Sequence, residues 1–490
     1  MNTVTGRIRM AYPPRLFRVF FGRKFHTLIA RGIGVEKAKH KNGFIKGAVI
    51  IAAGGFIAKI IGALYRIPLT NCIGGEGIGL YQMIYPAYCI LLTVSATGIP
   101  SSIAKLTAER IGKHKSSKPL FSTAMRLFVS IGLVGTLVLC LLAPVLARLQ
   151  NSKEAVGGYF ALAPSVLLVS AISVFRGWFQ GKNDMTPTAL SEVLEQVVKV
   201  ALGVVFAYLY RENVVKAVTF LLLAVTVAEG VALLFLFVLY RRADKNDGEV
   251  DGEIIRPRGI LSLSIPVTFS AILFPLSALI DSVLAVRLMG GYTQNAVALY
   301  GLFSGGAVTI INLPVSVCYG IAVASIPAIT KAKTELAVWK RLTEEERKTA
   351  KKPNPKKRLF FALGLTTAIA TPCVLGLYLF AKPACTIVFR SLQENELSVL
   401  VSLVKTFSIS ALTLSLVQTL AACLTAQGKP QYSALGMLVG VTVKTGVYTV
   451  LLQNPSISVF GLAHATNIGY TVAFLFDLWY NIRCIKQTKE

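Results

Sequence analysis

Two basic side chains interrupt the first long apolar stretch of the sequence, Lys59 and Arg66. They are seven residues apart, so they lie on one face of any helix that contains them. A cation inside a bilayer costs about 2.5–3.5 kcal/mol on insertion scales unless it meets water or an anionic partner. We therefore predict a cationic cavity wall that binds an anionic head group. The alternatives are an ion pair that only joins two helices and, for Arg66, a side chain that extends to the outer surface.

A second group of charges lies in the apolar stretch 187–210. Glu192, Glu195 and Lys199 are spaced three and four residues apart and share one helix face. Glu195 followed by Lys199 is the favourable order for a pair one turn apart. These residues either neutralise one another along the helix or form a polar face of the cavity. In the second interpretation Lys199 binds phosphate, and Glu192 or Glu195 relays a proton or a cation.

Asp281 lies in a third apolar stretch, 260–288, with no other charge within one helical turn. An isolated intramembrane carboxylate is a functional candidate by default, so Asp281 is a candidate site for a coupling sodium ion or proton. The alternative is an ion pair with a lysine of another helix, Lys405 or Lys444. Single charges in the other apolar stretches are weaker candidates: Glu229, Lys405, Lys444 and Asp477.

No enzyme motif accompanies these charges. The sequence has no P-loop, no GxSxG and no HExxH, so we predict neither a built-in ATPase nor a hydrolytic centre. Its eight Cys form no CxxC pair and its four His are dispersed, so we expect no metal site. The Gly-rich turn 74–79 follows a helix-length apolar run and not a strand, which argues against a nucleotide cradle. We predict no enzymatic activity, no catalytic residue and no cofactor beyond a coupling sodium ion or proton.

Membrane-spanning helices are the elements that hold these charges. With 54% hydrophobic residues, 15% charged residues and a mean hydropathy of +0.63, the chain has the composition of a polytopic membrane protein. An apolar run of about 20 residues spans the hydrocarbon core as a helix. We predict an all-α fold with about twelve such helices, fourteen being less favoured. Their approximate ranges are 44–70, 78–104, 120–147, 158–179, 187–210, 215–240, 260–288, 296–326, 359–381, 396–424, 431–452 and 458–482.

The formal net charge of +28 would suggest nucleic acid as a partner if the chain were soluble. Most Lys and Arg instead lie in connections on one side of the membrane: 105–126, 241–258, 331–358 and the C-terminal tail. Positive charge marks the cytoplasmic side of membrane proteins. We therefore predict a multi-pass protein of the cytoplasmic membrane with both termini in the cytoplasm, and no nucleic-acid partner.

The first 42 residues carry ten basic side chains against the single acid Glu36, with apolar residues near helical spacing. This pattern fits a basic amphipathic helix on the anionic inner leaflet. The alternative is a disordered tail or an upstream start codon. A signal peptide is not indicated, because basic residues break the apolar stretch and no small-residue cleavage site follows.

Three short matches repeat in order along the chain. They are Leu80-Tyr81 with Leu299-Tyr300, Gly98-Ile99-Pro100 with Ser325-Ile326-Pro327, and Gln180-Gly181-Lys182 with Gln427-Gly428-Lys429. Each half has six spans. Because six is an even number of crossings, both halves start on the same side of the membrane and share one orientation. They predict a pseudo-twofold axis along the membrane normal with a central cavity between the lobes. The predicted division is an extension at 1–42, an N-lobe at 43–242, a cytoplasmic linker at 243–258, and a C-lobe at 259–490 with the basic loop 331–358.

One stretch also resembles a known family. The run FIAKIIGALYRIPLTNCIGGEGIGLYQMIYPAY, followed by GIPSSIAKLTAE, is similar to the first two helices of the stage V sporulation protein B and lipid II flippase (MurJ-like) branch. That branch belongs to the multidrug/oligosaccharidyl-lipid/polysaccharide (MOP) transporter superfamily, and many of its members have fourteen spans. The resemblance implies that Lys59 lines the cavity, that Arg66 is about one residue out of register with the next charged position, and that Asp281 resembles a cation-binding position of the second lobe.

The resemblance implies a flippase or exporter that works by alternating access. Its expected cargo is an undecaprenyl-diphosphate-linked saccharide such as lipid II, for spore or vegetative peptidoglycan or for polysaccharide synthesis. The expected partners are this lipid-linked oligosaccharide and membrane lipids, and the expected state is a monomer. A diphosphate requires a cationic cavity to cross hydrocarbon, so the basic residues agree with this expectation.

Three alternatives predict different cavities. A cation-coupled multidrug exporter of the same superfamily predicts acids and aromatic residues, against which Lys59, Arg66 and Lys199 argue. A major-facilitator transporter shares the six-plus-six layout, but its loop signature is only faintly echoed at 108–115. A non-transporting scaffold for wall synthesis predicts dispensable cavity charges and indispensable surface loops such as 331–358.

Overall fold

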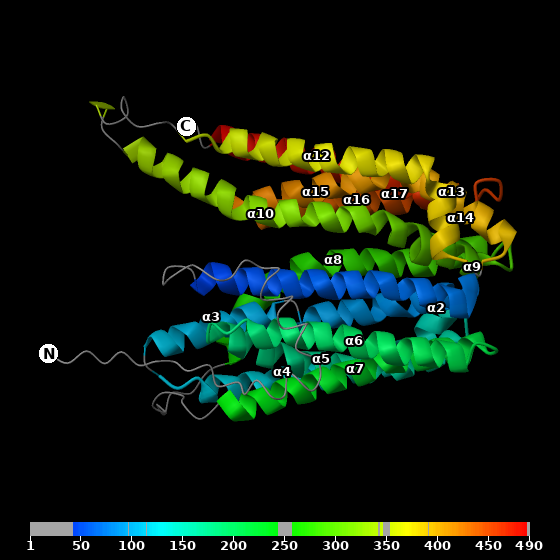
Figure 1. Cartoon of the computed structure of the whole chain (residues 1–490), viewed down its shortest axis with the longest axis horizontal. Helices are drawn as coiled ribbons and strands as arrows, with labels where there is room; N and C mark the ends of the chain where they lie inside the picture. The colour runs from blue at the N-terminus through cyan, green and yellow to red at the C-terminus, as the bar shows by residue number, and fades with distance from the viewer. Residues whose placement is uncertain are drawn as a thin grey trace.

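The computed structural model describes residues 43–96, 98–113, 115–243, 257–341, 344–345, 353–390 and 392–487. All its secondary-structure elements within these residues are helices, most of which run along the long axis of the molecule (Figure 1). The all-α prediction is therefore confirmed. The predicted extension 1–42, most of the linker 243–258 and part of the loop 331–358 lie outside the described residues.

The N-lobe consists of six helices that follow one another along the chain. They are α2 (Gly43–Ala96), α3 (Ile99–Gly112), α4 (Lys118–Leu149), α5 (Ala155–Gly181), α6 (Thr186–Leu209) and α7 (Val214–Ala243). Helix α2 contains the first predicted span and most of the second, which continues into α3, and a break at Gly74 separates the two. Gly74 has φ 65° and ψ −172°, a conformation that residues with a Cβ rarely adopt, so the Gly-rich turn is where the chain reverses.

The C-lobe follows in the same order, with more of its spans divided into short helices. They are α8 (Pro257–Met289), α9 (Ala296–Gly301), η1 (Leu302–Ala307), α10 (Val308–Arg341), α12 (Pro355–Leu379), α13 (Ala381–Val388), α14 (Glu394–Phe407), α15 (Ile409–Ala426), α16 (Pro430–Leu451) and α17 (Phe460–Gln487). Helices α9 and α10 are joined by the π-helical turn η1, which makes the three elements one span. The predicted basic loop begins as helix, because α10 continues to Arg341.

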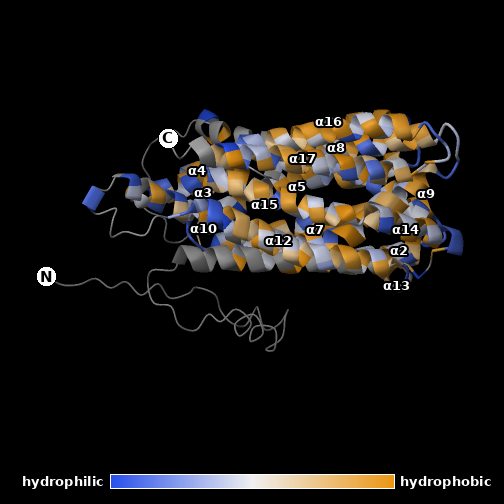
Figure 2. Cartoon of the chain, turned by 90° about the horizontal axis from the view of Figure 1, so that it is seen from above, coloured by the Kyte–Doolittle hydropathy of each residue, from blue (hydrophilic) through white to orange (hydrophobic). Residues whose placement is uncertain are grey.

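Nine helices among the described residues are long and apolar enough to cross a membrane. The twelve predicted spans fall on these helices or on other helices such as α6 and α17, so the structure is compatible with twelve crossings. Hydrophobic residues dominate the length of the bundle, and hydrophilic residues gather toward its two ends (Figure 2). The outer face of α4 is suited to acyl chains; the Leu141 side chain there is 75% exposed.

The two lobes repeat one packing scheme. In the N-lobe α5 packs against α4 and α7, and α6 packs against α7; in the C-lobe the corresponding helix α15 packs against α12 and α17, and α16 packs against α17. Each lobe buries its own apolar core, with Tyr88 and Trp178 almost inaccessible in the first and Tyr448 in the second. This agrees with the internal repeat seen in the sequence.

The lobes touch at the end of the molecule that carries the Gly74 turn. A Cβ at Gly79 would lie 2.1 Å from the carbonyl oxygen of Val297, so the backbones of α2 and α9 are in direct contact there. The amide of Gln150, which follows α4, also donates to the hydroxyl of Ser282 in α8 at 3.1 Å. The positive-inside pattern predicts that this end is extracellular.

Substitution of Gly79 by Val is expected to lower the stability of the folded protein by about 1–3 kcal/mol, because the new side chain has no room. The matched control is Gly364→Val, since a Cβ at Gly364 meets nothing within 4 Å. Thermal unfolding of the two purified variants in detergent measures the difference. Equal midpoints would show that the glycine contact between the lobes is not required.

Candidate functional site

A cavity of about 420 Å³ lies between the two lobes. Its N-lobe wall comes from α2 and α6, and its C-lobe wall comes from η1 and α10. The volume is in the range of small-molecule sites. The polar side chains that line it are Tyr65, Tyr81, Gln82, Tyr85, Gln196, Lys199, Thr309, Asn312 and Ser316. Among the described lining residues there is no carboxylate, and Lys199 is the one charged side chain.

Lys199 is held against aromatic rings on the N-lobe wall. Its ammonium lies 5.5 Å from the ring centroid of Tyr85, and Tyr85 stacks on Tyr81 with centroids 5.2 Å apart. A cation over an aromatic face is stabilised electrostatically while it keeps hydrogen-bond donors free. The wall therefore offers a positive charge and two ring faces to an occupant of the cavity.

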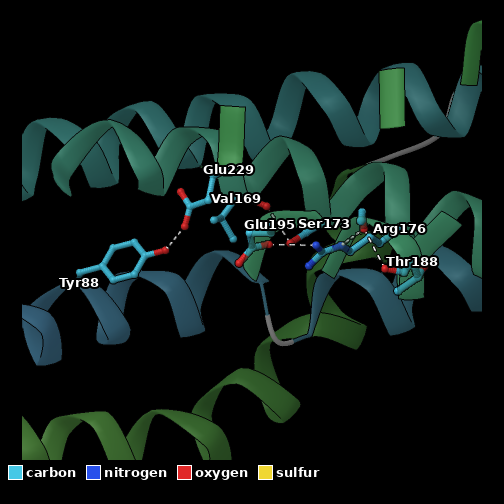
Figure 3. Close-up of polar contacts among 8 residues, drawn as sticks. Tyr88, Val169, Ser173, Arg176, Thr188, Glu195 and Glu229 are labelled. Carbon is cyan, nitrogen blue, oxygen red and sulfur yellow. Dashed lines mark hydrogen bonds and ion pairs between the residues drawn. The ribbon is translucent and has the colours of Figure 1, made fainter. Parts of the chain in front are cut away.

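Glu195 does not neutralise Lys199 in the structure. Its carboxylate forms an ion pair with Arg176 of α5, with 3.1 Å between Nη2 and Oε2 (Figure 3). Arg176 also donates from Nε to the hydroxyl of Ser191 at 2.9 Å. The pairing joins α5 to α6 and leaves Lys199 without a carboxylate partner among the described residues.

Arg176 was absent from the residues that the sequence analysis selected. The signal that would have found it is a single cation near the end of the apolar stretch 158–179. Its side chain is 16% exposed and reaches the Glu195 carboxylate across two helices. It therefore acts as a counter-ion for α6 and keeps that helix oriented toward the cavity.

Asp281 forms an ion pair with Lys444 across the C-lobe, the alternative that the sequence left open. The Lys444 ammonium is 2.5 Å from Oδ2 of Asp281 and donates to the Ser277 hydroxyl at 2.7 Å. Both charged side chains are largely buried, with 8% and 15% exposed. Lys405 has no part in this contact, because it is exposed and lies 5.9 Å from the ring centroid of Tyr378.

Several other predicted residues fall in different surroundings. The side chains of Lys59 and Arg66 lie outside the described part of the structure, although Ala58 and Gly62 of the same helix line the cavity. Glu192 is partly buried on α6 and faces α2, where its Oε2 would be 3.7 Å from a Cβ at Gly55. The substrate-binding and coupling roles of these residues stay predictions.

Glu229 and Asp477 are buried inside their lobes and are not among the residues that line the cavity. Glu229 is 2% exposed and accepts a hydrogen bond from the hydroxyl of Tyr88, as Figure 3 shows. Asp477 is completely buried on α17. No group of three or more His, Cys, Asp or Glu suited to a metal ion occurs among the described residues.

Comparison with known proteins agrees with this arrangement. The family model described as polysaccharide biosynthesis protein matches residues 44–333. Stage V sporulation protein B of Bacillus subtilis (strain 168) is 27% identical over 454 residues, which cover 89% of this chain and 83% of that protein. Lipid II flippase MurJ of the same strain is 23% identical over 464 residues, which cover 88% and 81% of the two chains.

A solved structure has the same fold. It is the inward-facing conformation of a multidrug resistance MATE family transporter of the MOP superfamily, with a TM-score of 0.73 at 18% identity. The match covers 88% of this chain and 95% of that one. Together with the two lobes and the cavity between them, this likeness defines the class of the fold, a two-lobed all-α membrane fold.

Within that class, the chain belongs to the polysaccharide biosynthesis protein family, whose model matches more than half of its length. Of the proteins it resembles, MurJ is a lipid II flippase and the MATE family protein is a multidrug resistance transporter. The resemblance inferred from the first two spans is thus confirmed.

Replacement of Lys444 by Met is expected to destabilise the protein by about 3 kcal/mol, because it leaves the Asp281 carboxylate buried without its counter-ion. The double variant Lys444→Met with Asp281→Asn should recover most of this loss, since it removes both charges. Lys405→Met is the matched control and should change stability by less than about 0.5 kcal/mol. Unfolding of the purified variants gives the coupling energy, and purely additive effects would contradict a stabilising pair.

Proposed function

We propose that this protein is a flippase that moves a lipid-linked anionic saccharide across the cytoplasmic membrane by alternating access. The observation that carries the proposal is Lys199, a cation on the wall of a cavity between two lobes that forms no ion pair among the described residues. The family and its relatives support transport of a polysaccharide precursor. Undecaprenyl diphosphate is the proposed lipid carrier, and a peptidoglycan precursor such as lipid II is the proposed cargo.

The cavity chemistry supports an anionic sugar-bearing head group. A diphosphate needs charge-assisted donors to leave water, and the Lys199 ammonium supplies such donors. Gln82, Gln196 and Asn312 offer amide groups that both donate to and accept from sugar hydroxyls. Lys59 and Arg66 are proposed as further members of the cationic wall.

The energetics favour outward movement of this cargo. With the cytoplasm negative, each negative charge that moves outward gains about 2.3 kcal/mol per 100 mV. The head group would bind inside the cavity while the lipid tail stays among acyl chains, and the lobes would then separate at the Gly74 end. A sodium ion or a proton is the proposed coupling ion for the return of the empty carrier.

The cavity disfavours the multidrug-exporter alternative. A cationic drug requires acidic side chains to neutralise it, yet the described lining carries none. The same lining favours transport over a scaffold role, because a scaffold requires no polar cavity with a lysine between two lobes. We propose that the protein acts as a monomer in the cytoplasmic membrane, with both termini inside and no nucleic-acid partner.

Replacement of Lys199 by Gln is expected to slow flipping roughly ten- to hundredfold, since a hydrogen bond to a charged group contributes about 1.5–3 kcal/mol. The assay follows a labelled undecaprenyl-diphosphate saccharide across liposomes that contain only this protein. Lys199→Arg should retain most of the activity because it keeps the charge.

The matched control is Lys216→Gln, which removes an exposed lysine near the start of α7 and should leave the rate unchanged. A wild-type rate in the Lys199→Gln variant would overturn the proposed role of the cavity cation. An absence of flipping by the wild-type protein, with or without a sodium or proton gradient, would favour the scaffold alternative.

A further inference from the structure

Glu229 and Asp477 are intramembrane carboxylates that form no ion pair among the described residues. Glu195 is neutralised by Arg176 and Asp281 by Lys444. Glu229 and Asp477 are the most deeply buried of the four, 2% and 0% exposed, and neither lies in an ion pair of the described residues. An ionised carboxylate without a counter-ion costs several kcal/mol in such surroundings, so each must be neutralised in some other way.

Among the residues that the structure describes, the surroundings of Asp477 offer its carboxylate no cation. Within the same residues, neither carboxylate oxygen has a hydrogen-bond partner. The nearby amide of Asn481 is already occupied, because its Nδ2 donates to the carbonyl oxygens of Leu420 and of Asp477 itself, at 3.3 and 2.8 Å. The polar side chain that faces the carboxylate is Ser433 of α16, and no ionisable described side chain of α14, α15 or α16 acts on it.

The space around Asp477 is too small for a hydrated or multiply coordinated metal ion. A Cβ at Gly436 would lie 2.2 Å from Oδ1, so the backbone of α16 closes directly over the carboxylate. Hard cations need several oxygen ligands at once, and the described neighbours of Asp477 do not supply them. A proton requires no such shell.

Glu229 is similarly placed in the N-lobe. Its Oε1 accepts the hydroxyl proton of Tyr88 from α2, and its Oε2 has no partner. The charged and ionisable groups that face it are Tyr85 and Tyr88 of α2 and Glu195 and Lys199 of α6. Arg176, from α5, is directed at Glu195 in Figure 3.

The internal repeat relates the two positions. Glu229 lies on α7 and Asp477 on α17, the last helix of each lobe. Their separation in sequence differs by one residue from that of Gln180 and Gln427, the nearest repeated motif. Two lobes with the same helix order therefore place a buried acid at equivalent points.

We propose that Asp477 and Glu229 are a pair of proton-binding sites, one in each lobe. Each carboxylate takes a proton from water onto an unpartnered oxygen when the helix packing over it opens, and returns that proton to water by the reverse step. Coupling of this exchange to lobe movement rests on the transport function proposed above, whereas the binding of the protons does not.

Infrared spectroscopy of the full-length protein in lipid nanodiscs tests the proposal directly, because the carbonyl stretch of a protonated carboxyl group is separate from the carboxylate bands. At neutral pH the wild-type protein should show this band. Asp477→Asn and Glu229→Gln should each remove one component, and the double variant should remove both. Asp281→Asn is the matched control and should remove none, since Asp281 is paired with Lys444.

An unchanged band in both Asp477→Asn and Glu229→Gln would overturn the proposal. So would a band that disappears when sodium is added at constant pH, because the ligand would then be the metal ion. If Asp477→Asn fails to fold, wild-type protein with ¹³C-labelled aspartate carboxyls replaces it. The label should shift the carbonyl band of a protonated Asp477. A band with no shifted component would contradict the assignment. Failure of the Lys199 experiment would leave these spectra unaffected, so the two proposals fail separately.

Discussion

Charge inside a bilayer must be neutralised or must reach water, and this requirement determines how the helices of each lobe are arranged. Arg176 with Glu195 joins α5 to α6, and Lys444 with Asp281 joins α16 to α8. Lys199 belongs to neither pair, and its position on the cavity wall is the basis for the anionic cargo proposed above.

The positions of the spans could be predicted from the sequence because apolar length and glycine conformation are local properties. The turn at Gly74 is an example, since its positive φ needs no information beyond the run of glycines. Prediction of the cavity required more information than the sequence contains locally, because its walls come from helices that are distant in the chain. The repeat predicted a space between two lobes, but not that Thr309 and Asn312 would face Lys199 across it.

The sequence did not predict which charged residues pair with one another. Glu195 and Lys199 have the spacing of an i,i+4 pair, yet the rotation of α5 against α6 brings Arg176 to Glu195 instead. Isolation in the sequence did not predict isolation in space. Asp281 stands alone in the sequence but is paired with Lys444, whereas Glu229 and Asp477 have no ion pair among the described residues. Both outcomes depend on helix rotation, which a single sequence does not specify.

The π-helical turn η1 affects how the C-lobe presents its cavity wall. A π turn contains about one residue more than an α turn, and each residue of a helix advances the side-chain direction by about 100°. The part of the span beyond η1 is therefore rotated by about that angle relative to an uninterrupted helix. Gly301 meets the N-lobe backbone before the turn, and Thr309 and Asn312 face the cavity after it. Because of the extra residue, one span contacts the N-lobe backbone through glycine at one end. Further along, the same span lines the cavity with amide and hydroxyl groups.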